Sequence, residues 1–253
     1  MRWFWLFAVL VLVGCSATAP APKAAREVAV PPKAPVRVEQ SVVHIEGEAP
    51  SCDVMIQGTG FVYAPQRVVT VAHVVAGVIP VSLVVTTVGG EVYEGSVVAF
   101  DPDVDVAVLY VPDLPAPPLR IARLSTFPLR LPGMSLGEAR LLSHSKGAKR
   151  LVAQQIKIEG RIEGEGPNIY REHDVSRMML TVSGHMDAGM SGAPLIVEDG
   201  TVAGMMVGAA TDEPDRGYAL TAEEILPIAD AATDATRHVS TRKCSGNRSS
   251  RTP

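Results

Sequence analysis

The sequence predicts an all-β fold built from two similar sets of antiparallel strands. Its 253 residues are 47% hydrophobic and 20% charged, which supplies a full core and excludes the disordered, collagen-like and disulfide-scaffold classes. From Gln40 to Leu220, short Val- or Ile-rich runs alternate with Gly, Pro or Asp breaks. The 22 Gly and 20 Pro are spread among these runs, which favours short strands joined by turns over long helices.

Six strand-like runs precede the Pro-rich stretch 112–118 and six follow it. The first set is 41–45, 60–63, 68–71, 81–88, 92–100 and 106–111, and the second is 139–143, 151–158, 178–182, 194–197, 202–207 and 217–220. Two such groups predict paired barrels or a sandwich. Thr221 and Glu224 form a capping-box pattern ahead of a helix at 225–232, which ends the folded domain.

The N-terminal segment 1–15 has the order of a signal peptide. Arg2 precedes an apolar run, Trp3–Val13, which is too short for the roughly 20 residues of a membrane-spanning helix. Its end, Leu12-Val13-Gly14-Cys15, resembles the bacterial lipobox, in which the cysteine is diacylated and becomes the mature N-terminus. Lipidation of Cys15 would hold the protein on a membrane outside the cytoplasm, in the cell envelope or periplasm. An ordinary secretory peptide is the alternative.

The predicted domain is 39–232, with the first set of strands in 39–118 and the second set and the helix in 119–232. Two further segments lie outside it. The Ala- and Pro-rich segment 16–38 has no apolar periodicity, and in polyproline II form it would be a tether of up to roughly 70 Å. The segment 233–253 is Ser/Thr-rich and basic, with no acid from Thr236 onward. We expect it to be disordered and solvated, with contact to an anionic surface as the alternative.

Two cysteines remain once Cys15 is assigned to lipid. Cys52 and Cys244 make an even pair in an oxidising compartment. The sequence gives no distance between them, so a disulfide and two free thiols both stay open.

Several function classes are excluded by charge and motif. The formal net charge of -4 gives no field that favours nucleic acid as the main partner. Asp101, Asp103 and Asp105 alternate as in a calcium loop, but Val106 and Pro112 stand where that loop needs Gly and Glu. The stretch 58–60, Gly-Thr-Gly, lacks the third glycine of a dinucleotide site, and the sequence holds no His-Glu-x-x-His zinc motif. No metal or cofactor is predicted.

Three polar residues stand in settings that suit nucleophilic catalysis. Ser191 lies between glycines in the stretch 189–194, Gly-Met-Ser-Gly-Ala-Pro, ahead of an apolar strand. A serine nucleophile needs a base, and His73 alone among the six histidines follows an apolar strand where a short helical turn can begin. Such a base is held in one tautomer by a buried carboxylate, and Asp105 precedes a buried strand. Taken singly, each residue is more often a turn, a cap or a structural histidine.

Together, these motifs resemble the trypsin-like, chymotrypsin-fold serine peptidases, and within them the HtrA-like bacterial branch, over about 40–232. The stretch 58–62 with 69–75 is similar to the entry strand and catalytic-histidine motif of that family. Asp101-Pro102 with 105–109 is similar to its catalytic-aspartate motif, and 189–194 to its nucleophile motif. Three motifs in family order are far more specific than any one of them.

The resemblance implies two six-stranded antiparallel β-barrels with a C-terminal helix and a triad in the cleft between the barrels. Ser191 would attack the scissile carbonyl, His73 would transfer the proton and Asp105 would orient His73. The backbone N–H groups of Gly189 and Ser191 would form the oxyanion hole. The primary pocket would be lined on one wall by Gly184, His185 and Met186, and on the other by Met206, Val207, Gly208 and Ala209. No acid lies at its base, so a small or medium apolar residue is expected, with an acidic residue through His185 as the alternative.

The sequence departs from the family pattern at several positions. Met190 and Ala193 stand where the family has Asn or Asp and a second Gly, but backbone donors do not depend on these side chains. The stretch 143–147 replaces a Gly-Pro-containing segment, and the residues after Ala232 are too few for a PDZ domain.

The expected function is a membrane-tethered extracytoplasmic serine endopeptidase that acts through an acyl-enzyme on envelope proteins, in quality control or processing. The main alternative is a catalytically silent lipoprotein that keeps the peptidase fold as a peptide-binding or scaffolding module. A structural envelope lipoprotein that uses its basic tail on anionic polymers is a third.

Overall fold

The computed structural model describes residues 37–123, 137–144 and 150–244. The predicted signal peptide with Cys15, nearly all of the predicted tether, most of the stretch 143–147 and the last residues of the tail lie outside this part of the chain. The contacts divide the chain into Met1–Pro35 and Val36–Pro253, and every element below belongs to the second unit. No helix among the described residues is both long and apolar enough to span a membrane.

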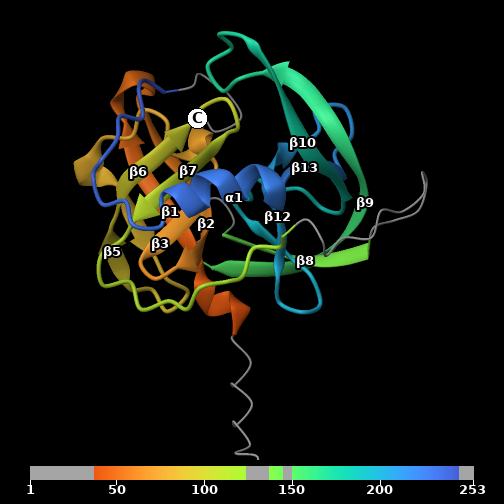
Figure 1. The fold of residues 1–253 in the computed structure, drawn as a ribbon, viewed down its shortest axis with the longest axis horizontal. Coiled ribbons are helices and arrows are strands. Elements are labelled where there is room, and N and C mark those ends of the chain that lie inside the picture. The colour runs from red at the N-terminus through yellow and green to blue at the C-terminus, as the bar shows by residue number, and fades with distance from the viewer. Residues whose placement is uncertain (1–36, 124–136, 145–149, 245–253) are drawn as a thin grey trace, which may run out of the picture. The chain divides into compact units, whose positions relative to one another are not determined.

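The first sheet has seven antiparallel strands in the order β5-β4-β1-β2-β3-β7-β6 (Figure 1). They are β1 (Val42–Ala49), β2 (Val54–Ala64), β3 (Arg67–Thr70), β4 (Val84–Thr86), β5 (Val92–Glu94), β6 (Ser96–Asp101) and β7 (Val106–Tyr110). The edge strands β5 and β6 are separated in the chain only by Gly95, whose N–H donates to Leu83 O at 3.0 Å. Because β5 and β6 are the two edges of the sheet and follow each other directly in the chain, the sheet must curl to bring these edges together. The first sheet is therefore barrel-like.

Two predicted strands of this sheet differ from the observed ones. The run 92–100 is two strands rather than one, because Gly95 lets the chain bend from one edge to the other. The run 81–88 begins as a 3₁₀ helix, Pro80–Ser82, and only Val84–Thr86 is strand. Pro80 has a fixed φ and no N–H, so it suits the first position of a helical turn better than a sheet.

The second sheet is a closed barrel in the order β10-β13-β12-β11-β8-β9. Its strands are β8 (Gly137–His144), β9 (Leu151–Pro167), β10 (Asp174–Ser183), β11 (Pro194–Ile196), β12 (Val202–Ala209) and β13 (Arg216–Thr221). Five of the six predicted runs lie within these strands, and the run 194–197 extends one residue past β11. The prediction of an all-β fold with two barrel-like sheets and a C-terminal helix is confirmed, but the first sheet has seven strands rather than the six expected.

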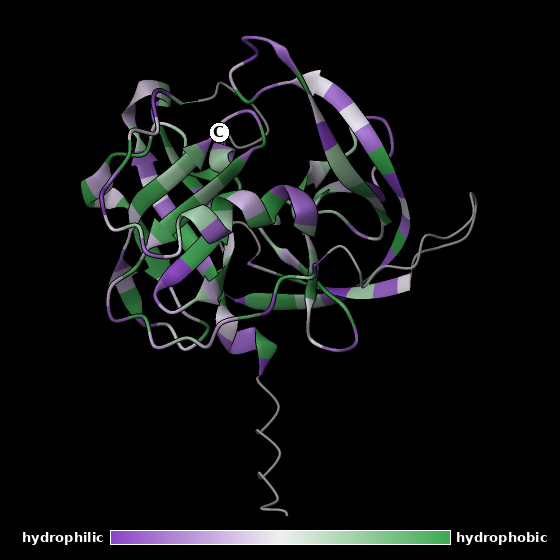
Figure 2. Ribbon diagram, in the orientation of Figure 1, coloured by the Kyte–Doolittle hydropathy of each residue, from purple (hydrophilic) through white to green (hydrophobic). Residues whose placement is uncertain are grey.

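The core follows from the apolar runs that predicted the strands. In the first sheet, Ile45, Phe61 and Leu109 are fully buried. The same cluster takes in Leu142 and Met205 from the second barrel, so the two sheets share apolar contacts. Figure 2 shows the hydrophobic residues concentrated on the strands of the first sheet, while β9 alternates in hydropathy along its length.

The C-terminal helix α1 (Ala222–Ala231) begins three residues before the predicted start. The predicted capping box does not form, because Thr221 makes no side-chain cap and Glu224 instead accepts the N–H of Met178 at 2.7 Å. Its buried Ile225 and Ala229 join the apolar cluster that the two sheets share, and Tyr63 of β2 donates its hydroxyl to Ala229 O at 2.7 Å.

The prediction that the tail is disordered from 233 is wrong for its described part, 233–244. Val239 N–H donates to Val97 O at 2.9 Å, and Thr241 O accepts from Gly77 N–H and the Tyr170 hydroxyl. Cys244 forms a disulfide with Cys52, with an S–S distance of 2.02 Å. The basic, Ser/Thr-rich composition predicts only that the side chains are solvated. The stretch is ordered by backbone hydrogen bonds to distant segments and by the disulfide.

Candidate active site

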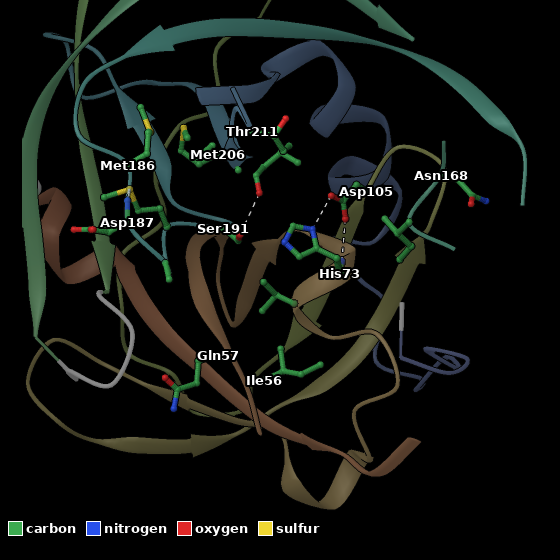
Figure 3. Close-up of a pocket in the computed structure, with 18 of the residues that line it drawn as sticks. Ile56, Gln57, His73, Asp105, Asn168, Met186, Asp187, Ser191, Met206 and Thr211 are labelled. Carbon is green, nitrogen blue, oxygen red and sulfur yellow. Dashed lines mark hydrogen bonds and ion pairs between the residues drawn. The ribbon is translucent and has the colours of Figure 1, made fainter. Parts of the chain in front are cut away.

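His73 stands at the point where β3 ends and the chain turns. Val71 leads into a 3₁₀ helix, Ala72–Val74, in which both flanking residues are buried while the His73 side chain stays 13% exposed. The Nδ1 atom of His73 lies 2.8 Å from Asp105 Oδ2, and its backbone N–H donates to Asp105 Oδ1 at 2.9 Å (Figure 3). Both oxygens of one carboxylate therefore fix the backbone and the ring of His73.

Asp105 owes its position to the tight turn that precedes β7. Asp101 Oδ1 accepts the N–H groups of Asp103 and Val104, each at 2.9 Å, and Asp101 O accepts that of Asp105 at 3.1 Å. Asp105 itself has a φ of 69°, and its side chain is only 3% exposed. Asp101 thus shapes the turn that aims Asp105 at His73.

The pKa of His73 reflects two opposing effects. Burial lowers it by penalising the charged ring, while the Asp105 charge and its hydrogen bond raise it. The charge and the hydrogen bond of Asp105 together outweigh burial, so the pKa of His73 lies above its ordinary value of 6.5. A carboxylate only accepts hydrogen bonds, so in the neutral ring Nδ1 carries the hydrogen and Nε2 has the free lone pair.

Ser191 lies in a tight turn between two glycines. Gly189 and Gly192 have φ angles of 100° and 84°, a region that disfavours residues with a side chain. Ala193 N–H closes the turn on Met190 O at 2.9 Å. The Ser191 hydroxyl donates to Val207 O of β12 at 3.1 Å, so in this arrangement β12 engages it rather than His73 (Figure 3).

A cleft of about 550 Å³ contains His73, Asp105 and Ser191. Of the pocket residues predicted from the sequence, those that line it are Met186, Met206, Val207, Gly208 and Ala209. Ile56 and Gln57 of β2 also line the cleft, as do Asn168, Arg171 and Arg177. In Figure 3, Met186 and Asn168 lie on opposite sides of the Ser191–His73 pair.

The prediction that Gly184 and His185 line this pocket is not met, because neither is among the lining residues. The His185 side chain is 71% exposed and its Nε2 pairs with Asp187 Oδ2 at 3.1 Å. Asp187 lines the cleft in its place. The sequence does not show which side chains of a loop face the cleft, so it could not distinguish His185 from Asp187 as the lining residue.

Two methionines narrow the pocket next to β13. The Met186 Sδ and Met206 Cε atoms would each lie 2.9 Å from a Cβ placed on Gly217. Gly217 therefore lies against the ends of the two methionine side chains, which would have to shift to admit a side chain there.

One residue at the site was missed by the sequence reasoning. Thr59 of β2 donates its N–H to Ser191 O at 2.9 Å and its hydroxyl to Gly189 O at 2.9 Å. By sequence, the Gly-Thr-Gly stretch resembles only a nucleotide motif and an entry strand. The available signal was a polar residue flanked by glycines within an otherwise apolar strand.

Comparison with known proteins identifies the family of this chain. Residues 58–205 match the trypsin-like peptidase domain. The serine protease Rv3671c of Mycobacterium tuberculosis (strain H37Rv) is 37% identical over 207 residues, which are 81% of this chain and 49% of that protein. The chain thus spans about half the length of the curated relatives it matches.

Solved structures extend the comparison. The active form of the Rv3671c protease aligns with a TM-score of 0.76 at 37% identity, covering 94% of this chain and 100% of that chain. The HtrA-type protease AlgW with a tripeptide aligns with a TM-score of 0.65 at 16% identity, covering 78% of this chain and 62% of that chain, which is a likeness of fold alone. From the family match and the mycobacterial relative, the chain belongs to the trypsin-like peptidase domain family.

Proposed function

We propose that this protein is a serine endopeptidase with His73, Asp105 and Ser191 as its catalytic triad. The observation that carries the proposal is the double hydrogen bond between Asp105 and His73 in the same cleft as Ser191. The relative from M. tuberculosis, which is named a serine protease, supports the same reaction class.

In this proposal Ser191 Oγ forms a bond to the scissile carbonyl carbon while His73 Nε2 takes its proton. The peptide C–N bond then breaks, and His73 returns the proton to the leaving amine. A water molecule then attacks the acyl-enzyme carbonyl carbon with His73 again as the base, and the ester bond to Ser191 breaks as His73 returns the proton to Ser191 Oγ. The N–H groups of Gly189 and Ser191 stabilise the negative oxygen, a contribution of about 2.7–4 kcal/mol for each donor in comparable enzymes. Ser191 first turns from Val207 O toward His73.

The end of β12 suits an extended substrate. β11 pairs with β12 only as far as Met205, while β13 covers the opposite edge to Ala209. A Cβ placed on Gly208 would meet nothing within 4 Å, so the space above this edge is open. A peptide strand adding to Val207–Ala209 would place its backbone beside Ser191. Met186 and Met206 favour a small apolar side chain in the adjoining pocket.

The cellular setting is part of the proposal and depends on the sequence alone. Arg2, the apolar run after it and the lipobox-like end at Cys15 support a lipid-anchored protein outside the cytoplasm. Its substrates would be envelope proteins in need of quality control or processing. Metabolic labelling with an alkyne fatty acid tests the anchor, because a Cys15→Ser variant should lose the label. Equal labelling of both chains would contradict it.

A catalytically silent peptide-binding module is the second candidate. The observation that favours it is the Ser191 hydroxyl bonded to Val207 O rather than to His73. Hydrolysis of an internally quenched peptide library by the full chain separates the two candidates. The endopeptidase proposal predicts turnover that Ser191→Ala abolishes and that Asp105→Asn lowers by roughly 10⁴-fold, through the wrong histidine tautomer. Library binding without turnover by the folded wild type would favour the silent module.

A further inference from the structure

Thr59 is a fully buried residue of the first sheet whose polar groups serve the nucleophile segment of the second barrel. Its N–H donates to Ser191 O and its hydroxyl to Gly189 O, each at 2.9 Å. Its carbonyl accepts the Thr70 hydroxyl at 2.7 Å. No role was assigned to this side chain by the sequence motifs.

The direction of the Thr59 hydroxyl is fixed by a second neighbour. The backbone N–H of His144, at the end of β8, donates to Thr59 Oγ1 at 2.9 Å. A hydroxyl has one hydrogen to give, and an N–H group cannot accept it. The single hydrogen of Thr59 therefore points to Gly189 O.

Gly189 O belongs to the peptide unit between Gly189 and Met190. This unit separates the two N–H groups, of Gly189 and Ser191, that the proposed function assigns to the oxyanion hole. Gly189 has a φ of 100° and no side chain, so its backbone has little intrinsic resistance to rotation. A rotation of this peptide plane would turn the two donors away from a common point.

The three carbonyls of the segment are held in different ways. Met190 O is held by Ala193 N–H and Ser191 O by Thr59 N–H, both of which are backbone donors. Gly189 O is held by the Thr59 hydroxyl, which is a side-chain donor. Replacing one side chain can therefore release the Gly189–Met190 peptide plane while the planes of the other two carbonyls remain fixed.

We propose that Thr59 is a positioning residue that sets the geometry of the oxyanion hole through Gly189 O. The inference rests on the proposed function, because it concerns the same reaction. Thr59 is buried beneath the nucleophile segment and does not line the cleft, so it acts on the transition state through Gly189 rather than by touching substrate. Its loss should lower kcat and leave KM nearly unchanged.

The test compares three variants of the full chain. Thr59→Val keeps the shape and loses the hydroxyl, and we expect kcat to fall roughly 10- to 100-fold, less than the 10²–10³-fold cost of deleting an oxyanion donor. Thr59→Ser restores the hydroxyl and should recover most of kcat. Thr70→Val is the matched control, since Thr70 is equally buried and also loses a hydroxyl hydrogen bond, but it does not contact Gly189 O.

A purely structural role predicts a different pattern. Thr59→Val and Thr70→Val would then lower the melting temperature and kcat together, and Thr59→Ser would give no selective rescue. That result, or an unchanged kcat in Thr59→Val, would overturn the proposal.

Amide hydrogen exchange distinguishes a failure of the Thr59 proposal from a failure of the proposed peptidase function. A wild type without turnover would contradict the peptidase reaction itself. Exchange in the segment 188–192 would still report on the contact, because Thr59→Val should accelerate it selectively at any level of activity. Exchange that is the same in Thr59→Val and wild type would overturn the restraint on Gly189.

Discussion

Ser191 and Val207 are joined by a hydrogen bond of 3.1 Å from the serine hydroxyl to the backbone carbonyl. Val207 also lies in the part of β12 that does not pair with β11. A substrate N–H that pairs with this carbonyl would compete with Ser191 for it and leave the hydroxyl to turn toward His73. Substrate pairing and activation of the nucleophile are thus coupled at one backbone oxygen in the proposed mechanism.

The raised pKa of His73 gives activity and stability opposite responses to acid. The proposed base must be neutral, so kcat/KM should fall as pH drops through the His73 pKa, at a midpoint above 6.5. The folded state binds this proton more tightly than the unfolded chain. Its contribution to stability is therefore fully present below pH 6.5 and lost as pH rises through the folded pKa.

Two measurements check these trends. The pH profile of kcat/KM gives the midpoint, and urea unfolding between pH 6 and 8.5 gives the free energy of unfolding, with His73→Gln as the reference for stability. An activity midpoint below 6.5 would contradict the assignment of Asp105 as the dominant neighbour of His73.

The two methionines in the pocket predict a preference for small side chains. Met186→Ala should raise kcat/KM for peptides with Leu or Phe at the cleaved position relative to Ala by at least about tenfold, within the range that one pocket contact supplies. Met55→Ala is the control, since Met55 lines the cleft but the atoms closest to a Cβ on Gly217 belong to Met186 and Met206. An identical preference in Met186→Ala and wild type would remove Met186 from the specificity pocket.

Gly192 should tolerate no side chain. Its φ is +84°, and a Cβ there would collide with Thr59 O and the Thr70 hydroxyl. Gly90 has a φ of +91°, but its Cβ would meet nothing within 4 Å. Gly90→Ala should therefore cost about 1–2 kcal/mol of unfolding free energy from its backbone conformation alone, and Gly192→Ala roughly 3 kcal/mol or more. Equal losses of unfolding free energy in the two variants, measured by urea unfolding, would contradict the close packing around Gly192.

The disulfide joins residues 192 positions apart and ties the end of the tail to the first sheet. Its reduction should lower the free energy of unfolding by roughly 2–5 kcal/mol, chiefly because the unfolded chain gains freedom. Urea unfolding with and without reductant measures this loss. A double variant, Cys52→Ser with Cys244→Ser, should show the lower stability in both conditions. A wild type that is insensitive to reductant while the two thiols are confirmed free would refute the prediction.

The parts of the fold that were predictable depend on local pattern. Alternating apolar runs place most strands, and the settings of His73, Asp105 and Ser191 each depend on a few neighbouring residues. The structure brings these three side chains into one cleft, as the motifs indicated.

The parts that were not predictable depend on distant partners. The order of 233–244 comes from contacts with Val97, Gly77 and Cys52, which no local composition reveals. Glu224 leaves the capping box because Met178 N–H is close to it in the fold. The role of Thr59 depends on Gly189, 130 residues away. Tertiary contacts outweigh local preference in all three cases.

Labelling with a fluorophosphonate tests the central claim most directly, because the reaction needs an activated serine and a formed oxyanion hole but no knowledge of the substrate. The full chain, Ser191→Ala and His73→Ala would be compared by intact mass, with circular dichroism to confirm that each is folded. The triad predicts one adduct on the wild type that is absent from both variants. A folded wild type without an adduct, or an adduct that persists in Ser191→Ala, would contradict it.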